Sequence, residues 1–221
     1  EQRHPGVQAM FLSGCGADAN THPRGGPRQE ELARQHGETL GQEVSRVVAD
    51  ELPPVRGPLS VGLDWTDLPL QHATPRRELE KLAADPSYWI ARNAKGMLES
   101  LDRGAPLPRY YRAPVALWQF GDDLTLVGLP GEAVADYVRL LQEALGPQGL
   151  WVSALSNESF GYLPTTKIQA EGGHETIGLT LDVGLFSPGT EDVVVAAVSR
   201  LAQEAGRELP KPQRGPLPRP E

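Results

Sequence analysis

Short apolar runs of strand character alternate along this chain with longer segments of helical periodicity, and this order is what most constrains the fold. Strands are expected at 8–12, 59–70, 115–120, 124–129 and 150–155. Helices are expected at 29–50, 76–84, 87–103, 133–145 and 191–208. Because the two kinds of segment alternate, the sequence predicts a mixed α/β fold with helices packed around a mixed, largely buried sheet.

Local signals support several of these boundaries. Val61, Leu63 and Trp65 alternate with other residues, which is typical of a half-buried strand. The segment 121–123 (Gly-Asp-Asp) joins two strand-like runs and indicates a hairpin. Pro53 and Pro54 follow the first helical segment and are expected to end it.

Length and composition limit the classes of protein. At 221 residues and 39% hydrophobic content, the chain suits one large globular domain, expected at 1–209. The segment 210–221 is rich in Pro, Lys and Arg and is expected to be a disordered tail. The net charge of -8 argues against a nucleic-acid partner. No apolar run approaches the roughly 20 residues of a transmembrane helix.

Polar residues gather in three loops that follow expected strands, which is where sites usually lie in sheet-and-helix folds. The loops are 13–22, 129–132 and 156–175. The residues of these loops that could carry chemistry are Asp18, Asn20, Glu132, Tyr162 and His174.

Each of these residues also has an ordinary structural explanation. A carboxylate at Glu132 would suit the start of the helix expected from 133. Asp18 and Asn20 are common loop residues that bond their own backbone. Tyr162 can be a packed aromatic residue with a satisfied hydroxyl group, and His174 can be a solvent-exposed loop residue. Taken singly, these residues leave both interpretations open.

The three loops together resemble the neutral/alkaline ceramidase family. Leu129-Pro130-Gly131-Glu132 follows a strand-like run, Ser156-Asn157 comes next, and Gly161-Tyr162 precedes Gly172-Gly173-His174-Glu175. The first loop, which contains Gly-Cys-Gly, Asp18 and Asn20, resembles the Gly-Asp-x-Ser-Pro segment of that family and looks most like a bacterial branch. The order and approximate spacing of these motifs cover residues 8–175, the carboxy-terminal half of the family's catalytic domain.

The resemblance implies a zinc-dependent hydrolase of a linear amide. In the family, zinc is bound by two histidines, by the glutamate of the Pro-Gly-Glu motif and by a tyrosine; those last two positions match Glu132 and Tyr162. A second family tyrosine, which stabilises the oxyanion, lies twelve positions after the ligand tyrosine. His174 stands at that position here, and histidine can also donate a hydrogen bond to an oxyanion.

Two departures from the family pattern accompany these matches. Asn20 stands where the family has its serine, and asparagine can orient water or substrate but cannot act as a nucleophile. Nearby Cys15 is interpreted as a small buried residue rather than a nucleophile. The two zinc histidines have no match here, because His4, His22, His36, His72 and His174 do not lie in a His-x-His-like segment. Either they lie upstream of Glu1, as the abrupt amino terminus favours, or the metal site has been lost.

The sequence therefore predicts a zinc amidohydrolase that acts on a small-molecule or lipid N-acyl substrate, seen without the upstream histidines. The alternative is a catalytically degenerate relative that binds a ligand or partner through the same cleft. A secreted or periplasmic location is expected if an upstream segment carries a signal peptide.

Overall fold

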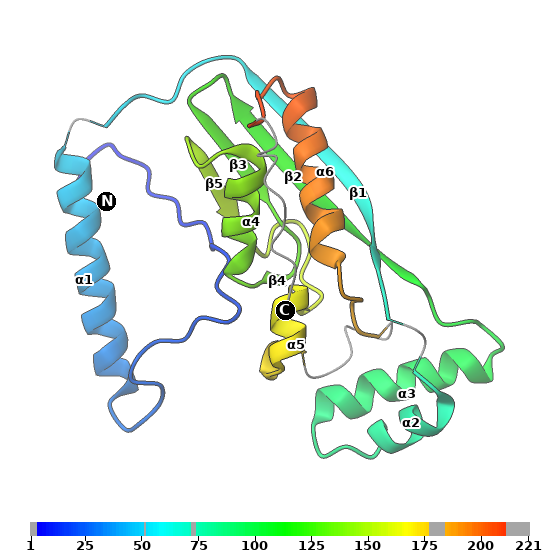
Figure 1. Ribbon diagram of the computed structural model, residues 1–221. Helices are drawn as coiled ribbons and strands as arrows, with labels where there is room; N and C mark the ends of the chain where they lie inside the picture. The colour runs from blue at the N-terminus through cyan, green and yellow to red at the C-terminus, as the bar shows by residue number, and fades with distance from the viewer. Residues whose placement is uncertain (1–3, 51, 72–73, 177–183, 211–221) are drawn as a thin grey trace, which may run out of the picture.

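The computed structural model describes residues 4–50, 52–71, 74–176 and 184–210. Among these residues the main sheet has four strands in the order β1-β2-β3-β5 (Figure 1): β1 (Leu59–Pro69), β2 (Tyr110–Phe120), β3 (Leu124–Gly128) and β5 (Leu150–Ser153). β2 is antiparallel to both β1 and β3, whereas β5 is parallel to β3. The mixed α/β class is confirmed.

Two helices cover one face of this sheet. In α4 (Asp136–Leu145), the buried residues Tyr137, Leu141 and Leu145 recur every four positions and form one apolar stripe. In α6 (Thr190–Glu204), the buried positions likewise lie on one side of the helix. Both stripes pack against the inward-facing residues of the strands and form the main core, whose members include Leu68, Val115, Leu117, Val127, Leu129, Tyr137, Leu141, Leu145, Phe160, Leu163, Phe186 and Leu201.

A second, smaller core lies outside the sheet. Helices α2 (Arg76–Leu82) and α3 (Tyr88–Asp102) pack on each other around Leu79, Ala94 and Met97. In Figure 1 this helical pair lies beside the end of the long β1–β2 ribbon, away from α4 and α6.

A short parallel pair of strands, β4 (Glu132–Ala133) and β6 (Tyr162–Leu163), forms a separate two-stranded sheet. It is followed by the short helix α5 (Thr166–Glu171) and the 3-10 turn η1 (His174–Thr176). These elements bring together the second and third polar loops of the sequence.

The strand expected at 8–12 is wrong. That segment has no strand conformation, and the side chains of Met10 and Phe11 are each 82% exposed. Among the described residues the apolar run pairs with no strand. Met10 and Leu12 border a cavity beside Leu126 and Trp151 of the sheet, and the Ser13 carbonyl oxygen accepts a hydrogen bond from the Ala154 amide (2.9 Å). Composition alone could not reveal that a partner strand was lacking.

The first helix forms as expected, as α1 (Gln29–Ala49), but it has no buried residue. In Figure 1 it lies beyond β5, separate from the sheet and its covering helices. No helix in the described ranges is long and apolar enough to cross a membrane.

The sheet is covered by helices on one face only. Val61, Leu63 and Trp65 do alternate along β1, but their side chains are exposed, and the intervening positions turn toward α6. A side chain added at Gly62 would lie 2.9 Å from Leu201 Cδ2 of α6, which fixes the direction in which the even-numbered positions of β1 point. The even-numbered positions of β1 therefore form its buried side, and the apolar residues Val61, Leu63 and Trp65 lie on its exposed side.

Candidate functional site

Glu132 lies in β4 and not at the start of a helix. The sequence predicted a helix from 133, whereas α4 begins at Asp136. The Glu132 amide donates to the Gly161 carbonyl oxygen (2.8 Å), and Glu132 is the direct partner of Tyr162 across the β4–β6 pair. A favourable interaction with a helix dipole therefore does not account for the presence of a carboxylate at position 132.

Gly131 sets the backbone that carries Glu132. Its φ angle is +62°, in the left-handed region that favours glycine. A Cβ atom at this position would lie 2.6 Å from the Phe160 ring and 2.8 Å from the Gly161 carbonyl oxygen. Only glycine allows the chain to pass this closely to the strand that presents Tyr162.

Tyr162 and His174 are neighbours despite their separation in sequence. Their rings meet edge to face, with centroids 5.5 Å apart. Burial raises the pKa of the Tyr162 hydroxyl group, and the negative charges of Glu132 and Glu175 raise it further. The positive charge of Arg24 acts in the opposite direction and lowers this pKa. Glu132, Tyr162, His174 and Glu175 thus lie close together, with Arg24 near enough to act on Tyr162.

These four residues line a cavity of about 800 Å³. Its other walls combine polar side chains, such as those of Arg92 and Asn93, with an apolar set that consists mainly of Trp89, Ile90, Phe160, Leu185 and Phe186. A cavity with apolar walls and a few polar groups gathered in one place is the usual form of a small-molecule site.

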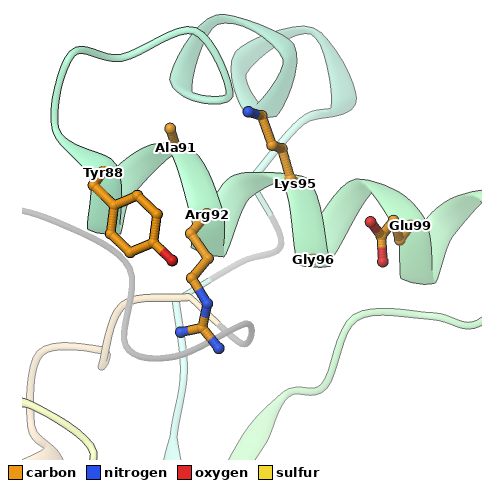
Figure 2. A pocket seen from close by; sticks show the side chains of 6 residues that line it. All are labelled: Tyr88, Ala91, Arg92, Lys95, Gly96 and Glu99. Atoms are coloured by element: carbon orange, nitrogen blue, oxygen red, sulfur yellow. The ribbon is translucent and has the colours of Figure 1, made fainter.

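The wall opposite the β4–β6 pair comes from α3, which sequence reasoning treated only as a helix. Trp89 and Arg92 both line the cavity, and the Arg92 guanidinium lies 5.9 Å from the centre of the Trp89 ring. Arg92 also lines a shallower cavity of about 430 Å³ along α3, shown in Figure 2 with Tyr88, Lys95 and Glu99. The aromatic pair at the start of α3 was the available sequence signal for this wall.

Gln169 adds an acceptor to the cavity. Its Nε2 atom donates to the Phe186 carbonyl oxygen (3.0 Å), while its Oε1 atom is buried and receives no hydrogen bond from the residues that the structure describes. A buried acceptor without a donor is costly, so this oxygen is suited to an N–H or O–H group on a bound molecule.

The first loop is attached beside the site but does not line the cavity. An oxygen of Asp18 accepts a hydrogen bond from the Ala135 amide (2.7 Å), and the Ala17 amide donates to the Ala133 carbonyl oxygen (3.3 Å). Asn20 is exposed. The structure thus brings Glu132, Tyr162 and His174 together, and gives Asp18 a backbone partner next to β4.

The Cys15 thiol is suited to packing rather than to attack. Burial and the charge of Asp18 raise its pKa to about 12, so the thiol remains protonated near neutral pH. Cys15 packs against the main core.

The residues present fit part of a zinc site. Glu132 and Tyr162 offer two oxygen ligands on paired strands, in a region where two carboxylates favour a cation. Catalytic zinc usually has three protein ligands, and the described part of the chain contains no group of three or more His, Cys, Asp or Glu residues placed to hold a metal. His22 and His36 are exposed, and His72 lies outside the described residues.

Comparisons with known proteins give one distant similarity. No family model and no curated protein matches the chain. A solved structure titled "Ceramidase complexed with C2" is similar with a TM-score of 0.31 and 20% sequence identity over 64% of this chain. The similarity covers 22% of that structure's chain, so this chain corresponds to about a fifth of its length. The molecule itself is a mixed α/β protein with a cavity beside its small β4–β6 sheet.

Proposed function

We propose that the cavity beside the β4–β6 sheet is the substrate site of a hydrolase that cleaves linear amides of the N-acyl class. The observation that carries the proposal is that Glu132, Tyr162 and His174, which come from two separate loops, line the same part of one cavity. The family resemblance of the motifs assigned these three residues to the reaction from the sequence alone.

The cavity matches the two halves of an N-acyl compound. Its apolar wall of Trp89, Ile90 and Phe186 suits an acyl chain. The unpartnered Oε1 atom of Gln169 suits the amide N–H group. His174, beside Tyr162, would donate a hydrogen bond to the oxygen that becomes negative when the carbonyl carbon is attacked.

Zinc is part of this proposal, with Glu132 and Tyr162 as two of its ligands. When bound, zinc would lower the pKa of a bound water to about 7 and polarise the carbonyl group. The carboxylates of Glu132 and Glu175, whose charges both act on Tyr162, support a cation at this position, and the positive charge of Arg24 opposes it.

The first test exchanges Glu132 for glutamine, which has the same shape without the charge. We expect Glu132→Gln to lower zinc content and to reduce kcat/KM for a fluorogenic N-acyl amide by about 100-fold or more. Glu171→Gln is the matched control, because Glu171 is exposed on α5 and does not line the cavity. Zinc is measured by mass spectrometry of the purified chain, and equal activity of the two variants would contradict the proposal.

A ligand-binding relative without catalysis is the second candidate. Asn20 is exposed and does not line the cavity, so the loop that carries the family's serine position gives the site no nucleophile. In that case fatty-acid amides would bind in the cavity and quench Trp89 fluorescence, but no product would form. Turnover of any N-acyl amide by the full chain excludes this candidate.

A further inference from the structure

Tyr111 of β2 lies behind the cavity and joins the main sheet to the loop 154–161, which leads to Tyr162. Its hydroxyl group donates a hydrogen bond to the side-chain carboxylate of Glu158. Neither Tyr111 nor Glu158 lines the cavity. Tyr111 lies opposite Leu68 in the β1–β2 register, so the main sheet fixes its backbone. The hydrogen bond therefore connects a long, regular strand to a loop of irregular conformation.

Glu158 extends this connection to the turn before Glu132. Its backbone carbonyl oxygen accepts a hydrogen bond from the Gly131 amide (2.8 Å). The left-handed φ angle of Gly131, +62°, sets the direction of the chain into β4. The next amide, that of Glu132, donates to the carbonyl oxygen of Gly161 in the same loop (2.8 Å). A displacement of the loop at Glu158 would therefore move the backbone that presents Glu132 and Tyr162.

The ring of Tyr111 packs against two aromatic residues that do line the cavity. Its centroid lies 5.0 Å from that of Phe160 and 6.4 Å from that of Phe186, in edge-to-face arrangements. Both phenylalanine side chains are buried. A phenylalanine in place of Tyr111 could pack in the same way, because this packing uses the ring alone. The packing thus does not account for the hydroxyl group, whose hydrogen-bond partner is Glu158.

The hydrogen bond between Tyr111 and Glu158 is suited to holding the loop firmly. A hydroxyl group that donates to a carboxylate makes a shorter and stronger bond than two neutral groups do. Burial raises the pKa of the Tyr111 hydroxyl group above its ordinary value, and the hydrogen bond and charge of Glu158 raise it further. The hydroxyl group therefore stays protonated at neutral pH and remains a donor.

We infer that Tyr111 is a positioning residue of the candidate site: by binding the Glu158 side chain, it holds the turn that presents Glu132 to the cavity. The expected effect on turnover rests on the proposed hydrolase function. The expected effect on the backbone at Glu132 does not, because it follows from the hydrogen bonds of Glu158 alone.

Tyr111→Phe tests the inference, because it removes the hydroxyl group and keeps the ring beside Phe160 and Phe186. We expect hydrogen exchange of the Gly131 and Glu132 amides to become faster by about tenfold or more, since local opening of the loop is then less restrained. Amides of β3 should keep their protection. With a fluorogenic N-acyl amide, kcat should fall by about tenfold while KM changes by less than about twofold, because misplacement of reacting groups affects turnover more than binding.

Tyr110→Phe is the matched control, because it removes the same group from the preceding residue of β2, which is 58% exposed. It should change neither hydrogen exchange nor kcat. Glu158→Gln keeps an acceptor for the Tyr111 hydroxyl group and should retain most of the activity, whereas Glu158→Leu should match Tyr111→Phe. The double variant Tyr111→Phe/Glu158→Leu should lose no more than either single variant, as expected of two residues that act through one hydrogen bond.

Unchanged exchange at Gly131 and Glu132 in Tyr111→Phe would overturn the inference, whatever the activity. Faster exchange with an unchanged kcat would also overturn it, because Tyr111 would then support the fold without positioning the reacting groups. Additive losses in the double variant would mean that the two residues act separately, which is equally contrary to the inference. If the unaltered chain hydrolysed no N-acyl amide, the proposed function would fail, and exchange at Glu132 would still decide whether Tyr111 holds that turn.

Discussion

Backbone conformation beneath the cavity positions the two candidate ligands. Gly131, Leu155 and Asn157 all have left-handed φ angles, of +62°, +54° and +67°. The Leu155 amide donates to the Gly131 carbonyl oxygen (2.9 Å), and the Gly131 amide donates to the Glu158 carbonyl oxygen (2.8 Å). Such a concentration of unfavourable backbone angles is typical of functional sites, where the surrounding contacts hold the chain in place.

Gly131→Ala tests this arrangement at a single residue. We expect it to lower the free energy of unfolding by more than about 2 kcal/mol, because the left-handed angle costs about 1–2 kcal/mol and the new Cβ also contacts Phe160 and Gly161. Gly104→Ala is the control, since Gly104 has a φ of +76° with no atom within 4 Å of an added Cβ. Urea denaturation measures both, and equal losses would contradict the predicted clash.

Among the secondary-structure elements, the end of α4 depends on a residue that follows α6. The Arg207 guanidinium donates to the carbonyl oxygens of Leu145 (3.1 Å), Gly146 (3.1 Å) and Gln148 (2.8 Å), and also to the Thr125 hydroxyl group. The last carbonyl groups of a helix have no partner within the helix. Arg207 therefore holds the α4–β5 connection against β3.

Arg207→Gln should destabilise the fold by about 2–4 kcal/mol, since several hydrogen bonds to a charged donor are lost and the carbonyl groups remain partly buried. Arg200→Gln serves as the control. Arg200 makes an exposed ion pair with Asp64, and such pairs contribute about 1 kcal/mol or less. Thermal unfolding followed by circular dichroism compares the variants, and a smaller effect at Arg207 than at Arg200 would contradict this role.

The sequence predicted most elements but not what each one contacts. Periodicity placed the five longer helices and four of the five strands, because the spacing of apolar residues reports secondary structure directly. It could not distinguish the two sides of β1, since apolar residues lie on both: Leu68 is buried, whereas Val61 and Trp65 are exposed. The short strands β4 and β6 were missed because two residues show no period. Glu132 stood out as a polar residue after a strand, and only the family resemblance gave it a role.

The candidate site shows the same limit. Motif order brought Glu132, Tyr162 and His174 to attention, and the structure places all three beside one cavity. Trp89 and Gln169 line that cavity too. Trp89 belongs to the aromatic pair at the start of α3, which was the available signal, whereas Gln169 lies in α5, a helix that the sequence did not predict. Neither position in the sequence shows that tertiary packing brings these residues to Glu132.

At the scale of the whole molecule, the cavity lies between parts that are stabilised by two separate cores. The β4–β6 wall belongs to the main core, whereas the α3 wall packs on α2 around Met97. Local unfolding of a region that has its own small core costs less free energy than unfolding of the main core. Helix α3, which forms one wall of the cavity, can therefore unfold locally while the main sheet stays folded.

Met97→Ala tests this separation, because Met97 is 1% exposed in the smaller core. Truncation of a buried methionine costs about 2–5 kcal/mol, and we expect that cost to fall on α2 and α3 alone. Amide hydrogen exchange in α3 should become faster by about 30-fold or more, the equivalent of about 2 kcal/mol, while amides of β2 and β3 keep their protection. Leu141→Ala, in the main core, should instead reduce protection in β2 and β3. If Met97→Ala accelerated exchange equally throughout the chain, the two cores would unfold as one unit, and the α3 wall could not move independently of the residues that present Glu132 and Tyr162.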